Sequence, residues 1–477
     1  MSAEARRMSH SDAWLWWMES DPRLHSTIMA ISMLDGAPDW DYLRARVDQL
    51  TRRVPAFRER VLEPPGRIGP PRLALVEHLE LDRHLRRMPA SGDGGWAGVL
   101  DVAAAIYTAP FPADRPLWEF VLLEGLEGGR TALVCKLHHS LADGIGGMQF
   151  AAMLVDLGPE MPSLEPAEDV PPGHPEGALP LVLETLADGM AEWAHLAERA
   201  ARQALPVGWG AVRHPREFVG GVAATATALG RMLKPETKRL SPLLADRGAE
   251  RGLATLQLPV DDLRGWAHEL GCSMNDAFVA SVTGGMRRYH EHHDAEVGDL
   301  LMGMPISLRR PGDEVGGNRA VVVRFPVPAG EVDVRQRISV VRERSRRWRA
   351  APSNNLNEGL AYVFNLLPTR VLSSSFTHVD FGTSNIPSVD VPVYLAGRKV
   401  LAYYPFGPTL GTALNVTLLS YAGTCFLGID ADLAAISDVD VLADCLRAGL
   451  DEVRDAATRS RDRHEGKRVR DNTLPAP

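Results

Sequence analysis

The sequence has few cysteines and no long apolar run. Its cysteines are Cys135, Cys272, Cys425 and Cys445. They are far apart and form no CxxC pair, which argues against a disulfide framework or a zinc cluster. No stretch of 18 apolar residues occurs, so we expect no membrane-spanning helix. The apolar stretch Trp14 to Met18 is too short for a signal-peptide core. We therefore expect a cytoplasmic protein with free thiols, whose contact with a membrane is peripheral.

An excess of positive charge is also absent. The chain carries 52 Lys and Arg against 61 Asp and Glu, a net charge of -9, so nucleic acid is not an expected partner. Hydrophobic residues make up 45% and charged residues 24% of the 477 residues. That composition is typical of globular proteins and excludes global disorder. The length predicts more than one hydrophobic core.

Proline marks the clearest boundary along the chain. The segment 158–175 (GPEMPSLEPAEDVPPGHP) is too rich in proline for regular structure. We predict an N-terminal domain over 1–165, a linker with crossover helices over 166–245, a C-terminal domain over 246–458 and a charged flexible tail over 459–477. The crossover helices are expected at Leu181 to Ala204 and Phe218 to Leu233, where apolar residues recur at helical spacing or nearly all round.

Each predicted domain mixes strands with helices. Short apolar, β-branched runs predict strands at Thr27 to Leu34, Arg130 to Leu137, Leu253 to Leu258, Ala320 to Val327, Leu414 to Ser420 and Thr424 to Ile429. Helical spacing predicts helices at Asp39 to Arg53, Ile145 to Leu157, Asp261 to Leu270 and from Asn275. The fold class is therefore mixed α/β.

The most informative segment is HHSLADG, from His138 to Gly144. It joins a predicted strand to a predicted helix. Successive strand residues point to opposite faces, so one of the paired histidines can face a cleft while the other packs inward. Asp143 can cap the helix or bind an arginine, and Gly144 supplies turn geometry. The alternative interpretation is a capping aspartate beside two structural histidines.

Further short motifs accompany HHSLADG in a fixed order. They are Pro116-Leu117-Trp118-Glu119, Asn275-Asp276, Pro305-Ile306-Ser307-Leu308-Arg309, Gly317-Asn318 and Thr383-Ser384-Asn385-Ile386-Pro387. With the opening MSHSDAWLWWMES and the closing PFGPTLGTALNVTLLSYAGTCFLGIDAD, this set resembles the bacterial wax ester synthase/diacylglycerol acyltransferase family. HHxxxDG alone is shared with other CoA-dependent acyltransferases and with peptide-synthetase condensation domains.

The resemblance implies two chloramphenicol-acetyltransferase-like domains that enclose a channel. It implies transfer of a long-chain acyl group from acyl-CoA, a co-substrate, to diacylglycerol or a long-chain alcohol at a membrane or lipid-droplet surface. Neither a metal nor a bound cofactor is expected. His139 matches the family's general base, which acts without an acyl-enzyme. His138 is expected to orient the turn, with a direct role as the alternative, and Asp143 to form an ion pair, for which Arg309 is a candidate partner.

Substrate contacts are assigned to four residues. Gly144 belongs to the motif itself. Asn275 is a candidate donor to the carbonyl oxygen, and its alternative role is to cap a helix. Ser384 and Asn385 are candidates for the same contact, and the alternative is a plain turn before Pro387.

Other candidate sites carry weaker signals. His290, His292 and His293 lack the i, i+4 spacing of a helical metal site, which favours a solvated helix end. The tryptophans of the N-terminal segment, Trp14, Trp16 and Trp17, fit either a lipid surface or a buried core. Two functions compete with the leading hypothesis: condensation-type acyl transfer to a specialised acceptor, and lipid binding without catalysis.

Overall fold

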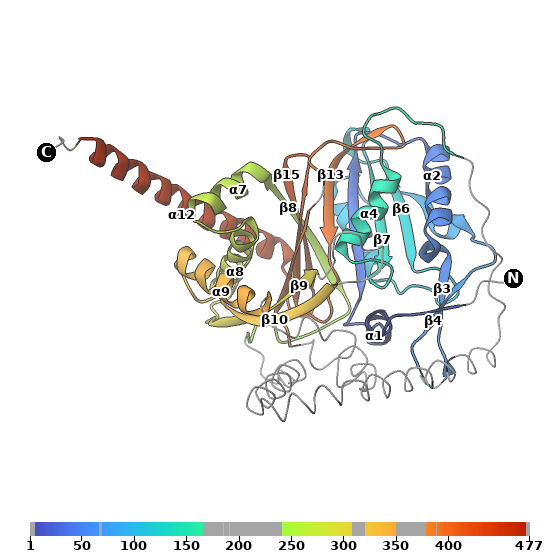
Figure 1. Cartoon of the computed structure of the whole chain (residues 1–477), viewed down its shortest axis with the longest axis horizontal. Coiled ribbons are helices and arrows are strands. Elements are labelled where there is room, and N and C mark those ends of the chain that lie inside the picture. The colour runs from blue at the N-terminus through green and yellow to red at the C-terminus, as the bar shows by residue number, and fades with distance from the viewer. Residues whose placement is uncertain are drawn as a thin grey trace, which may run out of the picture.

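The computed structural model describes residues 5–65, 69–165, 185, 190, 241–307, 320–349, 378–387 and 389–473. Within them, two six-stranded sheets and one three-stranded sheet form two domains that lie side by side (Figure 1). Sheets covered by helices agree with the expected mixed α/β class. Arg309 and nearly all of the two predicted crossover helices lie outside the described residues.

The first domain is built on a sheet with the strand order β12-β13-β2-β7-β6-β5. Its strands are β2 (Thr27–Leu34), β5 (Leu85–Pro89), β6 (Trp118–Glu124), β7 (Thr131–His138), β12 (Tyr394–Leu395) and β13 (Arg398–Phe406). Its helices are α1 (His10–Met18), α2 (Trp40–Arg53), α3 (Trp96–Thr108) and α4 (Gly144–Leu154). The small sheet β1-β4-β3 joins Arg6–Arg7, Arg72–Leu75 and Glu59–Leu62.

The second domain has a sheet with the strand order β10-β9-β11-β14-β15-β8. Its strands are β8 (Arg251–Pro259), β9 (Asp299–Ser307), β10 (Ala320–Pro328), β11 (Phe381–Pro387), β14 (Leu414–Tyr421) and β15 (Thr424–Asp432). Its helices are α7 (Val260–Glu269), α8 (Met274–His292), α9 (Val334–Arg349) and α12 (Val439–Thr473). These helices cover the face of the sheet that is turned away from the first domain (Figure 1).

The position of strand β13 differs from the predicted domain boundaries, which assign all of residues 246–458 to the C-terminal domain. Strand β13 follows β11 in sequence but pairs antiparallel with β2, so that Phe406 lies opposite Met29 and Tyr404 opposite Ile31. Figure 1 shows β13 among the strands of the first domain. The alternating burial along β13 fits a sheet covered on one face. Two strands from the second half of the chain, β12 and β13, therefore complete the first sheet.

The interdomain seam is the junction where β13 packs against β14 and β15 and where α4 meets β11. Gly428 of β15 lies so close to β13 that a Cβ there would overlap the carbonyl oxygen of Pro405. Two hydrogen bonds from α3 cross to the later half of the chain. Tyr107 Oη donates to the Gly407 carbonyl (2.8 Å), and Trp96 Nε1 donates to Thr255 Oγ1 (2.9 Å). Close backbone approach and these bonds hold the two sheets together.

The C-terminal segment differs from the predicted flexible tail. Helix α12 continues through it to Thr473 and runs out from the body of the molecule (Figure 1). The part of α12 up to Ser460 is anchored because Leu442, Leu446 and Val453 pack in the core of the second domain. The remaining turns continue the same helix.

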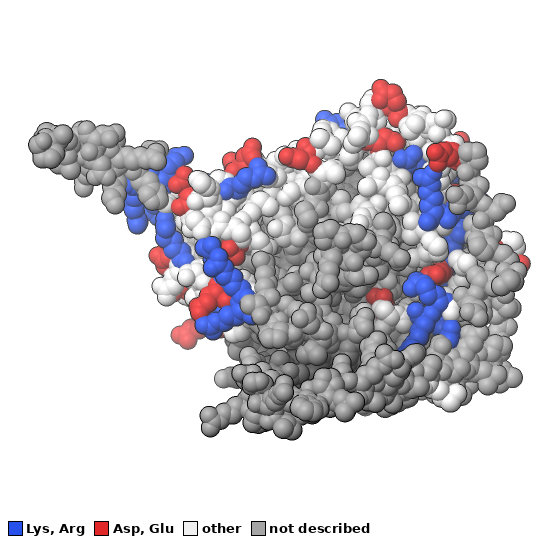
Figure 2. All heavy atoms as spheres, viewed as in Figure 1, with Lys and Arg blue, Asp and Glu red and all other residues white. Residues whose placement is uncertain are grey.

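No helix among the described residues is long and apolar enough to cross a membrane. On the face drawn in Figure 2, the described Lys and Arg side chains lie intermixed with Asp and Glu side chains.

We predict that Gly428→Ala strongly destabilises the protein. The added methyl group would force β15 away from β13, and overpacking of this kind costs about 3 kcal/mol or more where backbone must move. Urea unfolding would measure the change. Gly265→Ala is the control, because a Cβ at Gly265 on α7 meets nothing within 4 Å, and alanine there should stabilise the helix. Equal stability of the two variants would contradict close packing at the seam.

Candidate active site

The HHSLADG turn is fixed by the strands on either side of β7. His138 is the last residue of β7 and lies opposite Thr27 of β2. Its backbone N–H donates to the Leu117 carbonyl (3.0 Å), and the N–H of His139 donates to the Ser26 carbonyl (2.8 Å). Both neighbouring strands thus clamp the two histidines at the point where the chain leaves the sheet.

His138 is fully buried, with 0% of its surface exposed. The ring makes edge contacts with Trp16 (5.7 Å between centroids) and Phe111 (6.0 Å). Burial lowers the pKa of His138 to about 4, although the nearby Glu19 carboxylate opposes the shift. His138 is therefore neutral near pH 7.

The hydrogen bonds of His138 define its tautomer. The backbone N–H of Ser140 donates to Nδ1 (3.1 Å), so Nδ1 must be the unprotonated nitrogen. The proton of the neutral ring is then on Nε2, which lies 3.6 Å from Glu19 Oε1. Nε2 makes no hydrogen bond among the described residues, so Glu19 acts on the ring through its charge, while the lone pair of Nδ1 faces the turn. This arrangement agrees with the expected orienting role.

Glu19, which directly follows α1, connects several parts of the turn. Its Oε1 accepts a hydrogen bond from the Ser26 N–H (2.6 Å), and its Oε2 lies 3.7 Å from His25 Nδ1. Burial raises the pKa of Glu19, but the contacts with His25, His138 and the Ser26 amide outweigh it and the net shift is downward. An ionised Glu19 therefore faces the buried side of the paired histidines.

His139 is half-buried, in contrast to its neighbour. Its Nδ1 is buried and has no hydrogen-bond partner of standard geometry among the described residues. Desolvation lowers the pKa of His139, and Asp143 and the residue's own backbone oppose that shift. The ring is therefore neutral near pH 7, the form in which an imidazole can accept a proton.

Asp143 caps helix α4. It is 3% exposed, and its Oδ1 accepts a hydrogen bond from the Gly146 N–H (2.8 Å). The capping role, one of two considered from sequence, is thus present. Arg309, the candidate partner for an ion pair, lies outside the described residues. The charge of Asp143 also raises the pKa of His139. Asp143 therefore both caps the helix and stabilises the protonated form of His139.

Gly144 brings the turn to the interdomain seam. A Cβ at this position would lie 3.0 Å from Ile386 Cδ1 on β11. Ser384 lies two residues before Ile386, so it shares the strand face directed at the motif, whereas Asn385 points to the opposite face. Both are half-buried. Of the two predicted contacts on β11, Ser384 is the one that β11 presents toward the turn.

Asn275 lies at the start of α8 but does not cap it. Ser273 is the cap, and Ser273 with Asp276 forms a reciprocal capping box. The Asn275 side chain instead contacts Met304 Sδ (3.9 Å) on β9. Of the Asn-Asp pair considered as a helix cap, Asp276 takes part in the capping box with Ser273, whereas Asn275 does not.

Helix α1 contributes a second carboxyl group. Burial raises the pKa of Asp12 to about 7, and the charge of Asp143 adds to the shift, while Ser9 and Arg6 oppose it. The Asp12 Oδ2 accepts a hydrogen bond from the Ser9 hydroxyl (2.6 Å). Asp12, Trp16 and Glu19 follow one another at i, i+4 and i+7, so one helical face of this segment lies against the motif.

Of the tryptophans of α1, Trp17 is buried and Trp14 and Trp16 are half-buried against neighbouring side chains. Trp17 is 8% exposed and packs in the core of the first domain. Trp16 contacts His138 with its ring and donates from Nε1 to Glu63 Oε1 (2.6 Å). Trp14 packs against a small apolar cluster that contains Leu410. These contacts favour the core interpretation of the segment.

A cavity of about 460 Å³ lies beside Phe111. Its lining includes Phe111, Trp118, Arg83, Arg86 and Arg115. The Arg86 guanidinium pairs with Glu119, and Arg115 pairs with Asp114. The cavity thus has mixed charge, and Phe111 is the residue that it shares with the surroundings of His138.

Comparison with known protein families identifies the family to which the chain belongs. Residues 8–278 match the wax ester synthase/diacylglycerol acyltransferase catalytic domain, and residues 316–454 match the C-terminal domain of the same family. The chain belongs to the wax ester synthase/diacylglycerol acyltransferase family. The resemblance noted from its motifs is confirmed, and the protein is an acyltransferase of this type.

Individual relatives agree with the family assignment. A putative diacylglycerol O-acyltransferase of Mycobacterium tuberculosis is 34% identical over 91% of this chain and 89% of its own length. The wax ester synthase/diacylglycerol acyltransferase of Marinobacter aquaeolei has a similar structure (TM-score 0.64, 21% identity, 95% of this chain and 100% of that one). The first condensation domain of the calcium-dependent antibiotic synthetase is also similar (TM-score 0.61, 16% identity, 96% and 98%). These structures confirm the expected fold of two chloramphenicol-acetyltransferase-like domains.

Sequence reasoning missed Glu19 and Asp12. The spacing of Asp12, Trp16 and Glu19 is a signal that was available, since a polar, aromatic and acidic side chain share one face of an otherwise apolar helix. What the spacing does not reveal is the element on which that face packs.

The lowered pKa of His138 predicts a loss of stability in acid. Its pKa is about 4 in the folded protein and 6.5 in the unfolded chain, so below pH 6.5 the unfolded chain binds the additional proton. Between pH 6.5 and 5 the free energy of unfolding should fall by on the order of 2 kcal/mol from this residue. Urea unfolding of the wild type and of His138→Gln at both pH values measures the difference. An equal loss in the two proteins would refute it.

Proposed function

We propose that the protein transfers a long-chain acyl group from acyl-CoA to the hydroxyl group of a diacylglycerol or a long-chain alcohol, with His139 as general base. The observation that carries the proposal is His139 itself: a half-buried, neutral imidazole in a turn that adjoins the interdomain seam. The family relationship supports acyl transfer, and the named M. tuberculosis relative supports diacylglycerol as one acceptor.

Proton removal must accompany attack on the thioester. An alcohol of pKa about 16 facing an imidazole of about 6.5 is roughly 9 units uphill, which is about 13 kcal/mol if the proton moved first. In the proposed step the hydroxyl oxygen attacks the thioester carbonyl carbon as its proton passes to His139. The C–S bond then breaks, and His139 returns the proton to the departing CoA sulfur.

We propose that the residues around His139 position this ring and the reacting groups. His138, held by Ser140 and Glu19, orients the turn, and Asp143 fixes the start of α4 and favours the protonated form of His139. Negative charge that develops on the carbonyl oxygen needs a donor. The Ser384 hydroxyl is our candidate, because β11 presents it on the same face as Ile386, which contacts Gly144.

A cysteine nucleophile is disfavoured by the surroundings of Cys135. This residue is on β7, four residues before His139, and burial raises the pKa of its thiol to about 12. A thiol with that pKa is protonated at neutral pH and is a poor nucleophile. We therefore propose direct transfer, without an acyl-enzyme.

The acceptors of this reaction partition into lipid, so we propose that it takes place at a membrane or lipid-droplet surface. The likeness to a condensation domain favours one competing function, acyl transfer from a carrier protein to a specialised acceptor. The two functions differ in their donor, which an assay with free acyl-CoA distinguishes.

We expect His139→Ala to lower kcat by about 10²- to 10⁴-fold, the usual loss when a general base is removed. Circular dichroism should show an unchanged fold. Cys135→Ser is the matched control on the same strand and should retain activity. Near-normal turnover of His139→Ala would remove it from the mechanism, and loss of activity in Cys135→Ser alone would indicate an acyl-enzyme.

We expect the purified protein to release free thiol from palmitoyl-CoA when dioleoylglycerol or a long-chain alcohol is present. Thin-layer chromatography of the products would identify triacylglycerol, wax ester or both. Absence of thiol release with either acceptor would contradict the proposal and favour a carrier-protein donor or a lipid-binding protein.

A further inference from the structure

The three histidines near the end of α8 have different surroundings. His290 is fully buried, and both ring nitrogens have partners: Nε2 lies 2.7 Å from Ser241 Oγ and Nδ1 lies 2.8 Å from the Met286 carbonyl. His290 is therefore a structural residue of the core. His292, the last residue of α8, and His293, its C-cap, are exposed.

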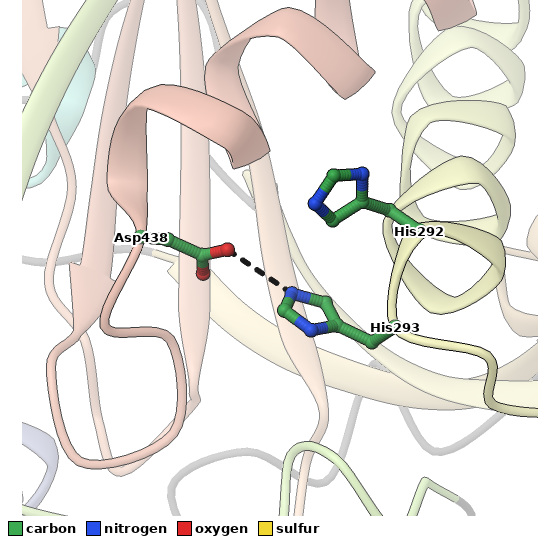
Figure 3. A group of neighbouring side chains, drawn as sticks. All are labelled: His292, His293 and Asp438. Carbon is green, nitrogen blue, oxygen red and sulfur yellow. Dashed lines mark hydrogen bonds and ion pairs between the residues drawn. The ribbon is translucent and has the colours of Figure 1, made fainter.

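A carboxylate from a distant part of the sequence approaches these two histidines. Asp438, directly before α12, places Oδ2 3.1 Å from His293 Nε2. Its Oδ1 accepts a hydrogen bond from the Tyr289 hydroxyl (2.6 Å). Figure 3 shows both histidine rings extending from the end of α8 toward the side from which Asp438 approaches. Tyr289 thus orients the carboxylate and leaves one oxygen directed at the histidines.

We propose that His292, His293 and Asp438 bind a divalent first-row transition-metal ion such as Zn²⁺. Two imidazole nitrogens and one carboxylate oxygen form a donor set suited to zinc, cobalt, nickel or copper rather than to calcium or magnesium, which prefer oxygen donors. With three protein ligands, the remaining coordination positions are open to water.

The distances require only a small adjustment. The three donor atoms lie within 4.8 Å of one another, whereas ligands about 2.0–2.2 Å from one tetrahedral ion stand roughly 3.4 Å apart. His293 and Asp438 are already close enough. The exposed His292 ring can close the remaining gap by rotation about its side-chain bonds, since it has room in solvent.

The neighbouring cations do not repel an incoming metal ion strongly. Arg287 pairs with Glu291 and with Glu452, and Arg288 also pairs with Glu452. Arg337 pairs with Glu452 as well, so Glu291 and Glu452 offset two of the three guanidinium charges, and Asp438 is the charged group in contact with the histidines. The Tyr289 contact adds the kind of outer hydrogen bond that orients a metal-binding carboxylate.

A metal ion at this position would join the end of α8 to the start of α12. The ligands are distant in sequence and converge only in the folded chain, so an ion that binds there stabilises the folded state. The site lies outside the HHSLADG turn, and its occupancy is independent of the proposed acyl transfer.

Titration of the full chain with ZnCl₂ tests the proposal, using protein without a histidine tag and a zinc-sensitive dye as competitor. We expect saturable binding of one ion per chain and a rise in melting temperature. His292→Ala and Asp438→Asn should each weaken the affinity by about tenfold or more. His292→Ala is the sharper variant, because removing this exposed ring should leave the fold intact.

His268→Ala is the matched control, since His268 is another exposed histidine, near the end of α7. It should retain the wild-type affinity and the shift in melting temperature. Two results would overturn the proposal: no saturable Zn²⁺ binding by the wild type, or the same affinity in His292→Ala as in the wild type. Equal weakening by His268→Ala would also overturn it, because it would indicate scattered surface binding.

Discussion

The structure of the candidate site depends on the pairing of β7 with a strand on each side. β2 pairs with β7 up to His138 and β6 pairs with it up to Leu137, so the end of β7 is held on both sides. The Leu117 carbonyl accepts a hydrogen bond from the His138 amide, and the Ser26 carbonyl accepts one from the His139 amide. These bonds place the two rings in different surroundings. The His138 ring is fully buried beside Glu19, and the His139 ring is half-buried beside the seam. The contrast between two adjacent residues of the same type follows from this clamp.

The half-buried carboxylates Asp12 and Glu19 show how the first helix takes part in the site. Glu19 accepts from the Ser26 amide, whose residue in turn accepts from His139, so the segment after α1 is connected to the turn through a short chain of hydrogen bonds. Asp12 lies close enough to Asp143 for their charges to interact. Such networks inside a protein are stronger than the same bonds in water. The N-terminal helix is therefore part of the support for the turn, and its aromatic side chains exclude water from it.

Local sequence patterns predicted much of the fold. The strand predicted from Thr27 to Leu34 is β2 with the same bounds, and the helix predicted from Asp39 to Arg53 begins one residue later, at Trp40. Such elements are set by the periodicity of apolar residues, which one segment carries by itself. The position of the histidine motif between a strand and a helix was predicted for the same reason.

Long-range relationships were not accessible in the same way. Nothing within Arg398–Phe406 indicates that this strand joins the first sheet, since its alternating pattern would suit an edge of either sheet. The approach of Asp438 to His293, and of Glu19 to His138, likewise depends on how separate elements pack. Residue spacing describes one element at a time, and a site assembled from several elements appears only when their packing is known.

The exchange of β13 into the first sheet affects how the protein is made. During synthesis on the ribosome, the first sheet is without two of its strands, β12 and β13, until residue 406 has emerged, and until then β2 presents an unpaired edge. Exposed edges of this kind are templates for association with other chains. The N-terminal half therefore cannot finish folding as an independent unit, and the nascent chain depends on rapid completion, or on chaperones, to avoid aggregation.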